Sequence, residues 1–64
     1  MTYNEAKQKH SSKAQIEIEK WEQETLNKAN NKKISQDQYY ARLSAIADYV
    51  YNRISLKQMW SRFN

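Results

Sequence analysis

The sequence predicts an all-α protein, and three observations support this fold class. None of the 64 residues is a glycine or a proline, so the chain lacks the residues that most often break helices and form sharp turns. Two segments carry apolar residues at three- and four-residue spacing, which is the period of an amphipathic helix. Three Ser-x-x-Gln sequences stand where the apolar pattern changes, and each matches the capping box that begins a helix.

The first amphipathic segment predicts a helix over about 12–30 that begins at a capping box of Ser12 and Gln15. Most of its apolar residues share an arc of about 140° on a helical wheel. Residues 1–11 form a polar segment that we expect to fray, because it contains good helix formers but nothing to bury. The asparagine-rich stretch that follows the helix predicts a turn. Either Asn30 or Asn31 is expected at the C-cap, because asparagine tolerates the left-handed conformation.

The second amphipathic segment predicts a helix over about 36–54, after a capping box of Ser35 and Gln38. A further apolar group follows, but a straight continuation would centre it about 200° away from the main apolar face. Either one straight helix carries two stripes or the chain bends. The capping box of Ser55 and Gln58 favours a bend and a separate short helix over about 56–63.

The short turn predicts that the two longer helices form an antiparallel hairpin, within a single helical domain over residues 12–64. A chain of 64 residues buries a small fraction of its surface, so two helices alone are marginally stable. Either the third helix folds back to complete the core or a second chain does. We favour a homodimeric helical bundle. The predicted core consists of Ile18, Trp21, Leu43, Ile46, Val50 and Ile54.

The C-terminal segment RISLKQMWSRF has three interpretations. It is a lid over the hairpin, a helix that binds a protein partner or a second copy, or a helix that lies on a membrane surface. Tryptophan, methionine and arginine are enriched at the centres of protein interfaces, which supports the second. Two turns are short for membrane anchoring, so we do not expect membrane contact. The predicted partner or dimer interface consists of Leu56, Met59, Trp60 and Phe63.

The chain is moderately basic, with 11 Lys and Arg against 7 Asp and Glu and a formal net charge of +4. Such a field favours anionic partners. In a hairpin the basic residues gather at the turn and at the terminal end, about 30 Å apart, a spacing close to that of successive DNA grooves. The simpler interpretation is a solvated surface. The candidate nucleic-acid contacts are Lys28, Lys32, Lys33, Arg53, Lys57 and Arg62.

The residue types argue against catalysis. The chain has no cysteine, and its single histidine, His10, stands in a polar stretch outside the predicted helices, with no second ligand nearby. We therefore expect neither an enzyme nor a metal or cofactor site. No apolar run approaches the ~20 residues that span a bilayer, and the N-terminus lacks the apolar core of a secretory signal. We expect a cytoplasmic protein.

One stretch resembles a known family. The segment KKISQDQYYARLSAIADYVYNRISLKQMW resembles the later helices of the Hha/YmoA family of nucleoid-associated modulators, and ISQDQYYARL also resembles short helical hairpins of the SHOCT type. The resemblance to the first family covers under half of the chain and needs a one-residue gap. That family's Ala-Asp-His-Arg stretch and its apolar first helix are missing here, so no residue role is carried over.

These features predict a small non-catalytic regulatory or adaptor protein that acts by helix-mediated protein–protein association. The alternative is a small DNA-binding or RNA-binding regulator that uses its basic ends. The lysine- and asparagine-rich composition also suits an accessory protein of a bacterium, phage or plasmid.

Overall fold

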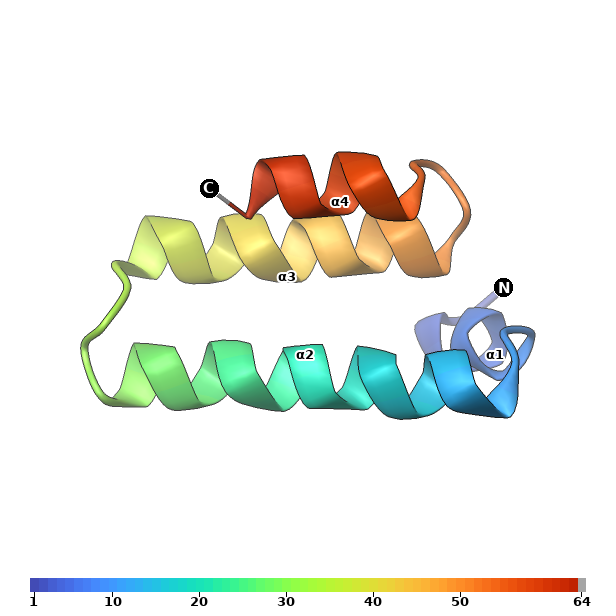
Figure 1. Ribbon diagram of the computed structural model, residues 1–64, viewed down its shortest axis with the longest axis horizontal. Helices are drawn as coiled ribbons and strands as arrows, with labels where there is room; N and C mark the ends of the chain where they lie inside the picture. Colours follow the sequence, from blue (N-terminus) through green and yellow to red (C-terminus); the bar gives the residue numbers. More distant parts are fainter. Residues whose placement is uncertain (64) are drawn as a thin grey trace.

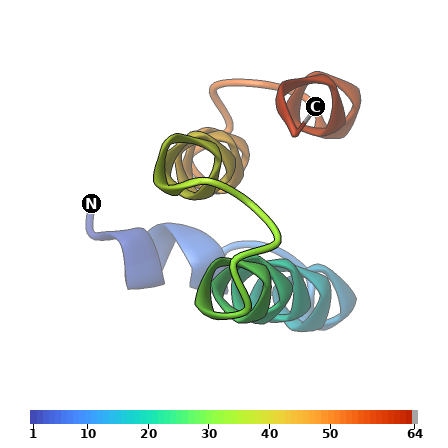
Figure 2. The same ribbon diagram turned by 90° about the vertical axis from the view of Figure 1, so that its left-hand side faces the viewer.

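The computed structural model describes residues 1–63, which form four helices and no strand. Helices α2 and α3 lie side by side along the long axis of the molecule, and α4 lies along α3 (Figure 1). Helix α1 lies across the direction of α2 and α3, next to the start of α2 (Figure 2). The prediction of an all-α fold is confirmed. The helices are α1 (Tyr3–Gln8), α2 (Ser12–Asn30), α3 (Gln36–Val50) and α4 (Leu56–Arg62).

Hydroxyl side chains begin all four helices. The predicted capping boxes of α3 and α4 are confirmed. The hydroxyls of Ser35 and Ser55 each accept the backbone N–H of the glutamine three residues later, and each serine's backbone N–H donates to the side-chain oxygen of that glutamine. The predicted box of α2 is wrong by one residue. Ser11 is the N-cap and accepts the N–H of Ala14 at 3.2 Å. Gln15 instead donates to the carbonyl oxygen of His10 at 2.9 Å, which ties α2 to the preceding turn.

Helices α2 and α3 end in the same way, without glycine. The residue after each C-cap, Lys32 and Asn52, has a positive φ of 58° and 62°. The N–H of Lys33 then bonds back to the carbonyl of Lys28 at 2.8 Å, and Arg53 bonds to Asp48 in the same way. This pattern is the Schellman motif, whose left-handed position usually holds glycine. Asn31 is the C-cap of α2, as predicted, but its φ is −90°, and Lys32 takes the left-handed conformation instead.

Residues 1–11 are not a frayed extension of α2. Thr2 caps the separate helix α1, and Ala6 on that helix is buried. The hydroxyl of Tyr3 donates to a carboxylate oxygen of Glu22 at 2.5 Å, and the Lys7 ammonium pairs with the same carboxylate at 3.2 Å. Burial first, and then this carboxylate, raise the pKa of Tyr3 well above its usual range, so the phenol stays a donor. These contacts with Glu22 hold the N-terminal segment against α2.

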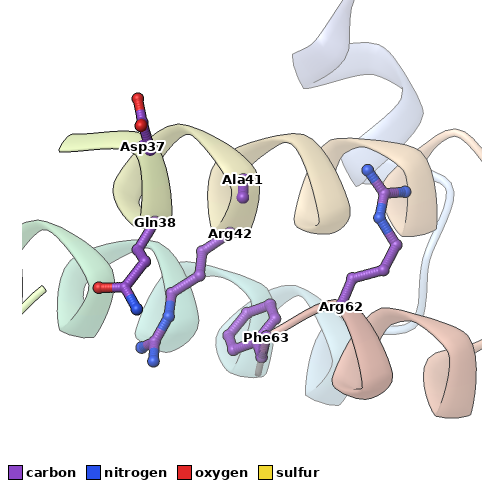
Figure 3. A pocket seen from close by; sticks show the side chains of 6 residues that line it. All are labelled: Asp37, Gln38, Ala41, Arg42, Arg62 and Phe63. Carbon is purple, nitrogen blue, oxygen red and sulfur yellow. The ribbon is translucent and has the colours of Figure 1, made fainter. Parts of the chain in front are cut away.

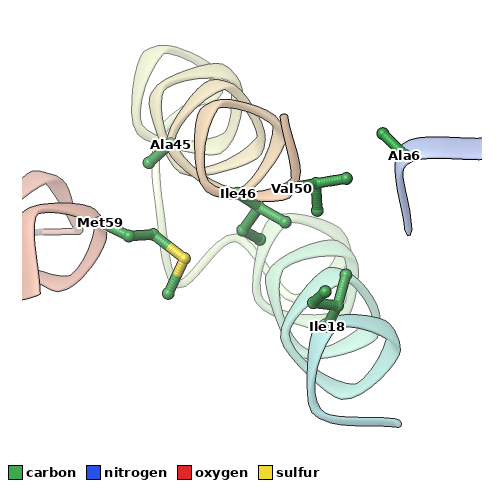
Figure 4. Packing of buried hydrophobic residues seen from close by; sticks show 6 residues of the cluster. All are labelled: Ala6, Ile18, Ala45, Ile46, Val50 and Met59. Atoms are coloured by element: carbon green, nitrogen blue, oxygen red, sulfur yellow. The ribbon is translucent and has the colours of Figure 1, made fainter. Parts of the chain in front are cut away.

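The core lies where α2, α3 and α4 meet, and α1 closes one end of it. Three of the predicted core residues, Ile18, Ile46 and Val50, are fully buried. The other three predicted residues, Trp21, Leu43 and Ile54, are half-buried. All four helices contribute side chains to this cluster (Figure 4). The buried hydrophobic residues are Ala6, Ile18, Ala45, Ile46, Val50 and Met59.

The predicted bend before the last helix is confirmed, but α3 ends at Val50 rather than near residue 54. The chain reverses over residues 51–55, and α4 returns along α3 (Figure 1). Met59 on α4 has no exposed surface, and Phe63, the C-cap residue of that helix, packs against the core. The last helix therefore completes the core of its own chain. Within residues 1–63, no helix combines the length and apolar character that crossing a membrane requires.

We expect Met59→Ala to lower the free energy of unfolding by about 2–5 kcal/mol, because it removes a fully buried side chain and leaves a cavity. Met59→Leu, which keeps the volume, is expected to cost less than about 1.5 kcal/mol. Urea unfolding followed by circular dichroism measures both, with Lys57→Ala as an exposed control on the same helix. If Met59→Ala unfolded at the same urea concentration as the control, α4 would not be packed on the core through Met59.

Candidate interaction surface

The four residues predicted as an interface on α4 do not lie on one exposed face. Met59 is fully buried and belongs to the core, so it is not available to a partner. Phe63 is half-buried against the same core. Leu56 and Trp60 are 40% and 42% exposed. They are spaced i,i+4 and share one side of the helix. The exposed part of the predicted interface is therefore this pair.

Trp60 stands in a row of aromatic rings that joins three helices. Its ring centroid lies 5.2 Å from that of Trp21 on α2 and 4.9 Å from that of Phe63, both edge-to-face. Trp21 in turn meets Tyr49 of α3 at 5.9 Å. Edge-to-face pairs at these distances are favourable and hold each ring in place. The helical pattern predicts Trp21 as a core residue. Its contact with Trp60 on α4 depends on the folded arrangement of the helices.

We name Trp21, Leu56 and Trp60 the tryptophan face. Charges of opposite sign lie on its two sides. Glu17 and Glu24 are four residues before and three residues after Trp21, so they lie beside it on α2. Exposed Lys57 follows Leu56 and precedes Trp60 by three residues on α4. Exposed Lys20 lies between these two glutamates, so the flank on α2 has a net charge of −1 and the flank on α4 has the +1 of Lys57.

The two C-terminal arginines among the predicted nucleic-acid contacts are bound to one carboxylate. Asp48 receives Arg62 at 2.6 Å and Arg53 at 3.3 Å, and Arg62 also donates to the Ser44 hydroxyl at 3.3 Å. The hydrogen bond from Arg62, helped by the one from Arg53, lowers the pKa of Asp48 below its usual 3.8. Arg62 lies beside the middle of α3 rather than at the end of the molecule. One carboxylate offsets only one of these two charges, so the expected second basic patch is weakened but keeps a positive charge, and it is spread along α3 and α4 instead of gathered at one end.

The basic patch at the turn is different. Lys28, Lys32 and Lys33 are exposed, and within residues 1–63 no acidic side chain pairs with them. Beside them lies a cavity of about 390 Å³. Tyr40, at its rim, is 58% exposed, and its ring meets that of Tyr39 at 5.4 Å. The residues that line this cavity are Ala29, Lys32, Ile34, Gln36, Tyr39 and Tyr40.

His10 is part of the fold, contrary to the expectation that it lies outside the structured region. Its Nε2 lies 3.0 Å from the carbonyl oxygen of Val50, at the end of α3, and its ring lies 5.3 Å from that of Tyr49. Through these contacts His10 joins the turn between α1 and α2 to the C-terminal end of α3. Among residues 1–63, no group of three or more His, Asp or Glu side chains is arranged to hold a metal ion.

Comparison of the chain with protein families, with characterised proteins and with solved structures gives no match. The resemblance of residues 32–60 to the Hha/YmoA family therefore carries no argument about function.

We expect Asp48→Asn to lower the free energy of unfolding by about 0.5–1 kcal/mol at pH 7, because it removes the carboxylate that holds two guanidinium groups. A lowered folded-state pKa stabilises the protein above the unfolded value and loses that effect as pH falls. The difference from wild type should therefore shrink below about pH 4 and vanish once Asp48 is protonated in the folded state. Thermal unfolding between pH 2 and 7 measures it.

A double-mutant cycle with Arg62→Gln provides the control. If the Asp48–Arg62 pair contributes as described, the two substitutions together should cost less than the sum of the single effects. Strictly additive effects would show that the pair contributes nothing.

Proposed function

We propose that this protein is a small non-catalytic regulator or adaptor that acts by association of helices, and that its tryptophan face binds a second copy of the chain. The supporting observation is the exposure of Trp60. The residue is 42% exposed although the rings of Trp21 and Phe63 contact its ring. A large aromatic side chain that is already ordered loses little conformational entropy when a partner covers it. Tryptophan is also the residue most enriched among the hot spots of interfaces.

Charge complementarity supports a second copy as the occupant. The face carries a net negative charge on its α2 flank and Lys57 on its α4 flank. In a two-fold symmetric dimer, the same patch is used by both copies, so the acidic flank of one can meet the basic flank of the other. Opposite charges at the rim of an interface align the partners and speed their association. A single chain with two complementary flanks provides both halves of such an interface.

The small core gives a second reason. A chain of about 60 residues buries only about 60% of the surface of its unfolded state, which leaves it marginally stable alone. Here two of the buried hydrophobic residues are alanines, which contribute little area. Covering Trp60 and Leu56 in a dimer would bury two more large apolar side chains from each copy. Association would then stabilise the fold by mass action.

We expect wild type to form a dimer whose dissociation constant rises at least about thirtyfold in Trp60→Ala, the loss typical of a hot-spot residue. Size exclusion with light scattering, run over a range of concentrations, measures the change. Ile16→Ala is the matched control. Ile16 is 68% exposed on α2 but lies about 140° around the helix from Trp21, so its removal should leave the dimer intact.

Two results would contradict self-association through this face. One is a wild-type chain that remains monomeric at millimolar concentration. The other is an equal weakening of the dimer by Trp60→Ala and Ile16→Ala, which would place the interface elsewhere. Circular dichroism of each variant separates a lost interface from a lost fold.

Nucleic-acid binding at the turn between α2 and α3 is a second candidate function. The observation that favours it is the patch of three exposed lysines, free of ion pairs within residues 1–63, beside the exposed ring of Tyr40. Lysines that contact phosphates together with an aromatic ring that stacks on a base are the elements of single-strand binding. Arg53 and Arg62 share the carboxylate of Asp48, so they are less available to phosphates than the three lysines of the turn.

If the turn binds nucleic acid, the double substitution Lys32→Gln, Lys33→Gln should make the slope of log affinity against log salt less steep by about 1.4 for a single strand. Fluorescence anisotropy with a labelled oligonucleotide, in a salt series that starts at 20 mM, measures the slope. Lys9→Gln, Lys13→Gln removes the same charge near the other end of α2 and should change the slope less. The absence of any binding by wild type at low salt would end this candidate.

A further inference from the structure

A second cavity, of about 270 Å³, lies between α3 and α4 and is separate from the tryptophan face. Figure 3 shows its side chains from close by. Two helices contribute to it, with the first two turns of α3 on one side and the end of α4 on the other. Its lining residues are Asp37, Gln38, Ala41, Arg42, Arg62 and Phe63.

Arg42 is the unusual residue of this cavity. Its guanidinium lies over the ring of Phe63, 5.3 Å from the centroid, which fixes the position of the charge by a cation–π contact. No ion pair within residues 1–63 includes it, and its Nε is buried without a hydrogen-bond partner. A buried donor without an acceptor costs free energy, and a guanidinium has five donors in a planar fork. The structure therefore holds a positioned guanidinium that makes no ion pair within residues 1–63.

Gln38 offers a second positioned donor. Its Oε1 accepts the backbone N–H of Ser35 at 2.8 Å in the capping box of α3, which determines which way the amide points. The amide nitrogen is left on the side of Arg42 (Figure 3). Because the capping box orients this group, the NH2 of Gln38 is held ready to donate without a further loss of rotamer freedom.

The other charged residues of the cavity do not oppose or duplicate Arg42. The carboxylate of Asp37 points away from the Arg42 guanidinium (Figure 3). The guanidinium of Arg62 also points away from it and is bound to Asp48 at 2.6 Å. The cavity thus presents one cation without an ion pair, one amide donor and an aromatic side chain in its lining.

We propose that this cavity binds a carboxylate group, with Arg42 and Gln38 as its hydrogen-bond donors and Phe63 against its aliphatic stem. Two donor groups match the two oxygens of a carboxylate, and planar guanidinium forks bind carboxylates well. A single uncompensated positive charge suits a monoanion better than a doubly charged phosphate. The volume accommodates a glutamate-sized side chain. The site does not depend on self-association, because neither donor belongs to the tryptophan face.

The test is an NMR titration of the full-length, ¹⁵N-labelled chain at 150 mM NaCl. The probes are N-acetyl-glutamic acid α-amide, which carries one side-chain carboxylate, and acetate, which lacks the stem. N-acetyl-glutamine α-amide is the neutral control and inorganic phosphate the competing anion. We expect saturable shifts of the Gln38 side-chain amide and the Arg42 Nε–H with the glutamic acid probe. Acetate should bind more weakly, and the neutral probe should cause no shift.

Two variants locate the site. Arg42→Gln should weaken binding of the glutamic acid probe at least about tenfold, because it removes the charged donor. Gln38→Glu keeps the capping box, since glutamate also serves at that position, but it places a carboxylate beside Arg42 and should abolish binding. Lys33→Gln removes one positive charge from the exposed turn and is expected to leave the affinity unchanged.

Several outcomes would overturn the proposal. These are the absence of saturable shifts, shifts that spread equally over the exposed lysines, and equal losses in Arg42→Gln and Lys33→Gln. Phosphate binding as tightly as the glutamic acid probe would show a general anion surface instead of a carboxylate site. If Arg42→Gln failed to fold by circular dichroism, Gln38→Glu would carry the test alone. Continued binding by that variant would equally overturn the assignment.

Discussion

The position of α4 depends on Met59, whose side chain is enclosed completely among residues of α2 and α3. The chain can return to place it there because Asn52 takes a left-handed conformation and closes the end of α3. Arg53, in the turn before α4, and Arg62, in the last turn of α4, then both pair with Asp48. A buried side chain, a tight turn and a shared carboxylate together hold a helix of only seven residues, which would not be stable in isolation.

Both surfaces that we propose as binding sites follow from this docking. Successive residues of a helix point about 100° apart, so burying Met59 turns Trp60 toward solvent at the edge of α2. There its ring centroid lies 5.2 Å from that of Trp21, a residue far away in the sequence. The same docking carries Phe63 to Arg42, where the ring and the guanidinium form one wall of the cavity between α3 and α4. One packing event therefore creates the tryptophan face and the carboxylate site.

The N-terminal helix solves a different problem for a chain this small. Helix α2 presents Glu22 at the border of its buried face, where an isolated carboxylate would be costly to desolvate. Tyr3 and Lys7 from α1 satisfy it, and Ala6 closes the end of the core beside Val50. His10 and Gln15 then fasten the junction to α3 and to the preceding turn. A segment that looks polar in sequence is ordered because its polar groups have partners inside the fold.

Local sequence determined much of this structure. The extent of α2, the capping boxes at Ser35 and Ser55, the buried stripe of Ile46 and Val50, and the change of direction before the last helix all depend on spacing within a few residues. Periodicity shows which residues share a side of a helix, but it does not show what covers that side. For this reason, only the tertiary structure decided that Met59 is enclosed while Trp60 stays exposed, and that two arginines pair with a carboxylate while Arg42 does not. Those outcomes depend on contacts between residues far apart in the chain, and the relative positions of whole helices set such contacts.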